Sequence, residues 1–206
     1  EEVDRRILAR LATLHFAPSE TEIANLKAEK IKGTIIKPYG NTVIDSVELA
    51  TQNNKQGDNK ALHLPEQYGL VAMRRNGFLA RPSLVQELLE VLRNYSEKTM
   101  PIIFINYPLT KASIEELQFD KYFGDKLIAV PSQSYFSFIK LLFGSSFVIT
   151  DSGGIQEEAA HINKPCLLHR DSTERTDGIG ENAVLSGFQQ RVVKEFLMNP
   201  QKYTNK

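Results

Sequence analysis

The sequence is poor in the residues that build disulfide frameworks and metal centres. Its 206 residues include a single cysteine, Cys166, and only four histidines, which are scattered along the chain. Because one cysteine cannot form a disulfide within the chain, we expect a reducing compartment and therefore a cytoplasmic protein. No group of His, Cys and carboxylate residues has the spacing of a metal site, so the sequence predicts no bound metal.

The chain also lacks an excess of either charge and any long apolar run. Lys and Arg together number 25, as do Asp and Glu. This balance argues against binding to nucleic acid or to an anionic membrane surface. No apolar stretch approaches the ~18 residues that a membrane-spanning helix needs. The chain begins at Glu1 without a methionine or a signal-like segment, and we expect it to be a fragment of a longer protein.

Apolar residues make up 41% of the chain, enough to bury the core of one large domain or slightly more. Two of the apolar runs, 102–105 and 147–149, are continuous rather than alternating. Continuous runs are typical of strands that are buried on both faces of a parallel sheet. Helical patterns lie between most of the apolar runs, so the sequence predicts an α/β layer fold.

Short apolar runs bounded by turn residues predict the strands, and helical spacing of apolar residues predicts the helices. The predicted strands are 14–17, 34–37, 68–73, 101–107, 126–130, 147–150, 165–169 and 183–185. The predicted helices are 1–13, 19–30, 42–50, 83–95, 112–117, 135–143, 155–162 and 192–198. The second helix begins with Ser19 and Glu22 at the spacing of a capping box. The polar stretch 52–59 is predicted to be a surface loop.

The segment Asp151-Ser152-Gly153-Gly154 follows the predicted strand 147–150 and opens a helix. Ligands of open parallel sheets bind beyond the carboxyl ends of the strands. The glycines let backbone N–H groups approach a ligand closely, and the N-terminus of a helix favours an anion. The segment therefore predicts a phosphate-binding loop. A plain strand-to-helix turn uses the same residue types and stays open as the alternative.

Charged residues accompany this loop. Glu157 and Glu158 fall in the first turns of the predicted helix, where carboxylates interact well with the helix dipole. A carboxylate beside a phosphate loop can also accept hydrogen bonds from the hydroxyls of a ribose. Arg170 and Arg175 follow the next predicted strand, on the same edge of the sheet. Arg175 could pair either with a phosphate or with a glutamate.

Three segments resemble the non-hydrolysing UDP-N-acetylglucosamine 2-epimerases. The most specific is Thr150–Glu158, TDSGGIQEE, with its sequel RDSTER at 170–175. The segments 1–5 with 15–20, and 40–45, GNTVID, match two further motifs of that family in the same order. The resemblance covers nearly the whole chain.

The resemblance implies a fold of the GT-B type, with two Rossmann-like three-layer domains, as in the UDP-glycosyltransferases and glycogen phosphorylase. Residues 1–39 would be the tail of the N-terminal domain, and residues 40–206 the C-terminal UDP-sugar-binding domain. The implied activity is that of an isomerase that interconverts UDP-N-acetylglucosamine and UDP-N-acetylmannosamine without a metal or redox cofactor. Family members often form homodimers and serve the synthesis of cell-envelope polysaccharides.

The family's binding roles transfer to matching positions of this sequence. By resemblance, Ser152, Gly153 and Gly154 hold the diphosphate, and Glu158 binds the ribose hydroxyls. Arg175 contacts the nucleotide sugar, and Gln133 and Phe138 flank the uracil. The resemblance also makes Glu1 a catalytic acidic residue. Phe138 also fits an apolar helical stripe, so a core position stays open for it. Gln133 fits equally well as a residue at the start of a helix.

The sequence departs from the family pattern at the predicted strand 68–73. The family carries a histidine in this region, and that position, which we take as a second catalytic candidate beside Glu1, is Arg74 here. An arginine can grip a diphosphate, but it does not titrate near neutral pH. Three alternatives to an epimerase therefore stay open: a UDP-sugar-binding module without catalysis, a hydrolysing relative, and a GT-B glycosyltransferase.

Overall fold

A computed structural model describes residues 2–52 and 64–204. Glu1 and nearly all of the predicted loop 52–59 lie outside the described residues. The chain divides into two compact units, Glu1–Ser46 and Val47–Lys206. No helix of the described part is both long and apolar enough to cross a membrane.

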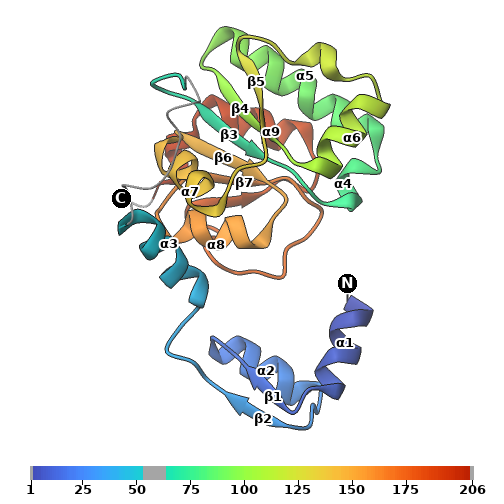
Figure 1. Ribbon diagram of the computed structural model, residues 1–206, viewed down its shortest axis with the longest axis vertical. Helices are drawn as coiled ribbons and strands as arrows, with labels where there is room; N and C mark the ends of the chain where they lie inside the picture. Colours follow the sequence, from blue (N-terminus) through green and yellow to red (C-terminus); the bar gives the residue numbers. More distant parts are fainter. Residues whose placement is uncertain (1, 53–63, 205–206) are drawn as a thin grey trace. The chain divides into compact units, whose positions relative to one another are not determined.

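The first unit is a small parallel β-α-β arrangement preceded by a helix (Figure 1). Strands β1 and β2 pair in parallel, with His15 opposite Ile35. The predicted capping box opens α2: the Ser19 hydroxyl accepts a hydrogen bond from the Thr21 N–H at 3.1 Å and donates one to the Glu22 carboxylate. The elements are α1 (Glu2–Leu11), β1 (Leu14–Phe16), α2 (Glu20–Ala28), β2 (Thr34–Ile36) and α3 (Thr42–Gln52), which continues into the second unit.

The second unit is built on a six-stranded parallel sheet with the order β5-β4-β3-β6-β7-β8. Counted along the chain from β3, this is the strand order 3-2-1-4-5-6 of doubly wound Rossmann folds. The strands are β3 (Gly69–Ala72), β4 (Ile102–Asn106), β5 (Leu127–Pro131), β6 (Phe147–Thr150), β7 (Cys166–Leu168) and β8 (Ala183–Leu185). The helices are α4 (Asn76–Leu79), α5 (Pro82–Lys98), α6 (Pro108–Glu116), α7 (Tyr135–Gly144), α8 (Gly153–His161) and α9 (Gln190–Met198), with 3-10 turns at Asp120–Tyr122 and Pro200–Tyr203.

Helices cover both faces of this sheet, which gives three layers (Figure 1). Every residue of β3, β6 and β7 is buried, as the continuous apolar runs predict. Successive strand residues alternate between two cores: Val71 packs with α4, α5, α6 and α9, whereas Leu70 packs with α3, α7 and α8. The predicted parallel α/β fold is therefore confirmed.

The predicted strands are all present, and the helices differ from prediction mainly at their starts. Helix α6 begins at Pro108 rather than at residue 112, because proline is well suited to the first position of a helix. Helix α8 begins at Gly153 rather than at residue 155, so both glycines belong to its first turn. The short helix α4 was not predicted, and its Phe78 and Leu79 are buried in the core.

Candidate functional site

The candidate site lies where the winding of the sheet reverses, between β3 and β6. These strands are neighbours, but the helices that follow β3 pack on one face and α8, which follows β6, packs on the other. The crevice beyond the carboxyl ends of two such strands is the usual ligand site of open α/β sheets. Arg74 follows β3 there, and Asp151 and Ser152 follow β6.

Asp151 joins the two loops of this corner. Its carboxylate is buried, with 1% of the residue exposed, and accepts hydrogen bonds from the N–H groups of Arg74 at 3.0 Å and Arg75 at 2.8 Å. Burial raises the pKa of Asp151, although these N–H groups lower it in part. Thr150 strengthens the corner, since its hydroxyl donates to the last carbonyl of β3 at 2.8 Å. These hydrogen bonds thus hold the loops after β3 and β6 together.

The first turn of α8 faces this corner, and the first N–H groups of a helix have no partner within the helix. Ser152 is the N-cap residue of α8, but its side chain makes no capping hydrogen bond. Its hydroxyl instead accepts a hydrogen bond from Arg74 Nη2 at 3.2 Å. A Cβ built on Gly154 would meet only Ser152 Oγ, at 3.9 Å, so the space beside this residue is open. The N–H groups of this first turn, a hydroxyl and a guanidinium converge here, as an anion site requires.

Glu158 lies in the next turn of α8, with 7% of the residue exposed. Burial raises its pKa to about 7, while the Tyr135 hydroxyl and the charge of Arg74 lower it in part. Its Oε2 is buried and has no hydrogen-bond partner among the described residues. Burial raises the pKa of Tyr107, while the charge of Arg74 lowers it in part and that of Glu158 raises it further. A buried acceptor without a partner is uncommon, and a ligand hydroxyl would satisfy it.

The loop after β7 brings Arg175 to α8. Arg175 Nη1 donates to Glu157 Oε1 at 3.0 Å, so this arginine forms the pair with a glutamate that the sequence left open. Gln156 anchors the loop, because its Nε2 donates to the carbonyls of Arg175 at 3.2 Å and Asp177 at 2.8 Å. Arg175 Nε is buried without a hydrogen-bond partner in the described part of the chain. A Cβ on Gly153 would come within 3.2 Å of Arg175 Cγ, so the arginine lies directly beside the helix start.

Two of the remaining predicted residues, Gln133 and Phe138, follow β5. Gln133 is half-buried after β5, and its Nε2 donates to the Pro131 carbonyl at 2.6 Å. Phe138 has 6% of its surface exposed and packs in the core under α7, which is the position that its apolar stripe also predicts. Their contacts with a base stay predictions, as does the role of Glu1, which lies outside the described residues.

Sequence reasoning assigned no role to three residues of the corner: Tyr107, Tyr135 and Asp151. Each follows the carboxyl end of a strand, β4, β5 or β6. The rule that pointed to Ser152 would have pointed to these positions as well. What the sequence could not show is that Asp151 turns inward and serves the backbone instead of a ligand.

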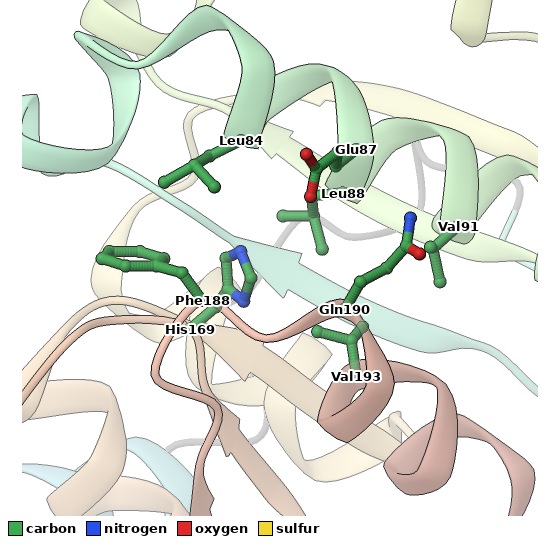
Figure 2. Close-up of a pocket in the computed structure, with 8 residues that line it drawn as sticks. All are labelled: Leu84, Glu87, Leu88, Val91, His169, Phe188, Gln190 and Val193. Atoms are coloured by element: carbon green, nitrogen blue, oxygen red, sulfur yellow. The ribbon is translucent and has the colours of Figure 1, made fainter.

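A separate small cavity lies between α5 and α9. Figure 2 shows Leu84, Leu88 and Val91 of α5 facing His169 and Phe188 across it. The cavity is small and partly open to solvent. The cavity belongs to the face opposite α8, so we do not assign the function to it. No group of three or more His, Cys, Asp or Glu residues suited to a metal ion occurs in residues 2–52 and 64–204.

Comparison with known proteins gives the chain its family. A family model described as UDP-N-acetylglucosamine 2-epimerase matches residues 1–199. The chain belongs to the UDP-N-acetylglucosamine 2-epimerase family. The resemblance that the TDSGGIQEE segment predicts is therefore confirmed.

Individual epimerase relatives cover nearly the whole chain. The UDP-N-acetylglucosamine 2-epimerase of Escherichia coli (strain K12) is 30% identical over 205 residues, which are 95% of this chain and 54% of that protein. The crystal structure of Methanocaldococcus jannaschii UDP-GlcNAc 2-epimerase in complex with UDP-GlcNAc and UDP is 27% identical, with a TM-score of 0.88, and the match covers 100% of this chain and 58% of that one. The Neisseria meningitidis enzyme bound to UDP-GlcNAc is also 27% identical, with a TM-score of 0.79 over 98% of this chain and 57% of that one.

Two facts follow from these epimerase matches. The predicted fold class, a Rossmann-like α/β domain of the GT-B type, is confirmed. The chain spans a little over half the length of the relatives that it matches.

Proposed function

We propose that this chain is part of a UDP-N-acetylglucosamine 2-epimerase, an isomerase that interconverts UDP-N-acetylglucosamine and UDP-N-acetylmannosamine. UDP leaves C1 as a base removes the proton from C2, which gives a 2-acetamidoglucal. UDP and a proton then add back, and the proton enters from the opposite face of C2. We further propose that the full-length protein is a cytoplasmic homodimer.

The observation that carries this proposal is the corner between β3 and β6. Ser152, Gly153 and Gly154 offer a hydroxyl and backbone N–H groups at the start of α8, and Arg74 contacts the same hydroxyl at 3.2 Å. This arrangement suits the diphosphate of a UDP-sugar, and the solved relative from M. jannaschii contains UDP-GlcNAc and UDP. The buried, unpartnered Oε2 of Glu158 suits a ribose hydroxyl.

Within the proposed reaction these residues stabilise the leaving group. Negative charge grows on the diphosphate as the bond to C1 breaks, and donors fixed in place by the Asp151 hydrogen bonds stabilise it without reorganising. Arg175 contributes a further positive charge beside Gly153. The base that takes the C2 proton is assigned to acidic residues such as Glu1, at the start of the chain.

The test is proton exchange at C2. The full-length protein is incubated with UDP-N-acetylglucosamine in deuterated water, and the deuterium content at C2 is followed by NMR. Exchange together with formation of UDP-N-acetylmannosamine is the expected result. Tight binding of UDP without exchange would instead identify a binding module, and net release of the free sugar would identify a hydrolase.

A further inference from the structure

Glu174 places a carboxylate beside the first turn of α8. Its Oε2 accepts a hydrogen bond from Arg170 Nη2 at 2.8 Å, and its Oε1 lies 3.8 Å from Arg75 Nη2. The same Oε1 is 3.4 Å from the point that a Cβ on Gly153 would reach. The carboxylate therefore lies near the positive end of a helix and contacts two guanidinium groups, an environment that equally suits a phosphate.

Glu174 is the carboxylate at this corner that can most readily leave. Asp151 is buried and holds two backbone N–H groups, and the Glu157 side chain, paired with Arg175, is only 6% exposed. The Glu174 side chain is 54% exposed and belongs to a loop. Exposed ion pairs contribute little to stability, so solvent can replace these contacts at little cost.

The arginines of this loop keep donors that Glu174 does not satisfy. Arg170 Nη1 and Arg175 Nε are both buried and have no hydrogen-bond partner in the described part of the chain. A diphosphate carries more acceptor oxygens than one carboxylate does and can reach several donors at once. Exchanging Glu174 for a diphosphate would therefore satisfy more of the buried donors.

We propose that Glu174 is an internal counter-ion that the diphosphate of the ligand displaces, so that this residue sets how tightly phosphorylated ligands bind. The inference rests on the proposed function, because it takes the start of α8 to be the diphosphate site. It predicts that removing the Glu174 charge strengthens ligand binding, whereas removing a residue that merely positions the arginines would weaken it.

The experiment compares three forms of the full-length protein by calorimetry: wild type, Glu174→Gln, and the control Glu116→Gln. Glu116 is exposed at the end of α6, which leads back towards the start of β5 and the opposite edge of the sheet. We expect Glu174→Gln to bind UDP about two- to fivefold more tightly, since an anion near a helix N-terminus has an effect of that size. Uridine, which lacks the diphosphate, should bind the wild type and Glu174→Gln equally, and the control should match the wild type for both ligands.

The outcomes separate the inference from the function on which it rests. If the wild type binds UDP but Glu174→Gln binds it equally or more weakly, the counter-ion role is overturned and the proposed function stands. Equal tightening for uridine would also overturn that role, because the effect would then not involve the diphosphate. A wild type that does not bind UDP would overturn both.

Discussion

At the scale of single residues, the Glu158 carboxyl has the most unusual environment at the site. It is buried, one of its oxygens has no partner among the described residues, and burial raises its pKa to about 7. Such a group lowers the stability of the ligand-free protein. Its burial becomes favourable only when a ligand donates hydrogen bonds to it. Binding sites commonly hold groups of this kind at the expense of stability.

We predict that Glu158→Gln stabilises the ligand-free protein at high pH but not at low pH. Because the folded-state pKa lies above the ordinary value of 4.5, the folded protein keeps this proton while the unfolded chain loses it. The Glu158 contribution to stability therefore falls as the pH rises from about 4.5 to about 7. The variant should exceed the wild type by about 1–3 kcal/mol at pH 8 in urea denaturation, and the gap should close below pH ~5.

The exposed Glu116 supplies the control for this measurement, and Glu116→Gln should follow the wild type at both pH values. A gap between Glu158→Gln and the wild type that stays constant with pH would show that Glu158 ionises normally. UDP affinity gives the second readout, because Glu158→Ala should bind UDP more weakly once the proposed ribose contact is lost. If calorimetry shows that Glu158→Ala binds UDP as tightly as the wild type, Glu158 does not contact the ribose.

The sequence pointed to Glu158 by family resemblance, but it could not show this environment. Burial, the missing partner of Oε2 and the nearby Tyr135 hydroxyl all depend on how α7 and α8 pack beyond the sheet. For Phe138 the same packing favours a core position, which was the alternative that its apolar helical stripe predicted. Side chains whose role is set by neighbours distant in sequence are the part of a site that a single sequence leaves undetermined.

At the scale of elements, the start of α8 is the part of the fold on which the proposed function depends. Neither Gly153 nor Gly154 has a positive φ, so backbone conformation does not require glycine at these positions. The environment of Gly154 is open, whereas Gly153 lies close to Arg175. The helix itself therefore does not require glycine at 154, and the proposed diphosphate would approach this position closely.

We predict that Gly154→Ala raises stability and lowers UDP affinity at the same time. A methyl group fits the open space, and alanine favours a helix over glycine by up to about 1 kcal/mol. The same methyl group would fill the space that a phosphate needs, and we expect UDP to bind at least about tenfold more weakly, a loss of about 1.4 kcal/mol. Denaturation and calorimetry on one sample test both effects.

Gly124→Ala provides a matched control, because Gly124 also has open space around it but precedes β5 at the other edge of the sheet. That variant should bind UDP as the wild type does. If Gly154→Ala binds UDP normally, the phosphate does not bind at the start of α8, and the proposed site is wrong.

The elements themselves could largely be predicted, because a strand buried on both faces leaves a continuous apolar run in the sequence. The predicted start of α6 at residue 112 was four residues late, although Pro108 could have marked it, since proline favours the first helical position. The order of the strands could not be predicted, because apolar runs do not specify that β3 lies beside β6. That adjacency brings Arg74 to Ser152, which are far apart in the sequence, and so creates the site.

At the scale of the whole molecule, the two units differ in how much core each contains. The second unit holds both large hydrophobic clusters and every site residue that the structure describes. The first unit leaves Ile7, Leu8, Leu11 and Phe16 each more than half exposed. A unit of this size with so much exposed apolar surface buries too little to offset its conformational entropy.

We therefore predict that a fragment of residues 40–206, which keeps α3 intact, folds by itself and separates binding from catalysis. It should unfold in one cooperative transition and bind UDP within about tenfold of the affinity of the full-length protein, because the corner between β3 and β6 is complete within it. It should show no exchange at C2, since the residues proposed to supply the base, Glu1 among them, are absent. A fragment of residues 1–39 should lack a cooperative transition by circular dichroism. If the fragment 40–206 alone catalyses exchange, the base belongs to the second unit. If the fragment folds but does not bind UDP, the ribose and diphosphate contacts need the rest of the protein.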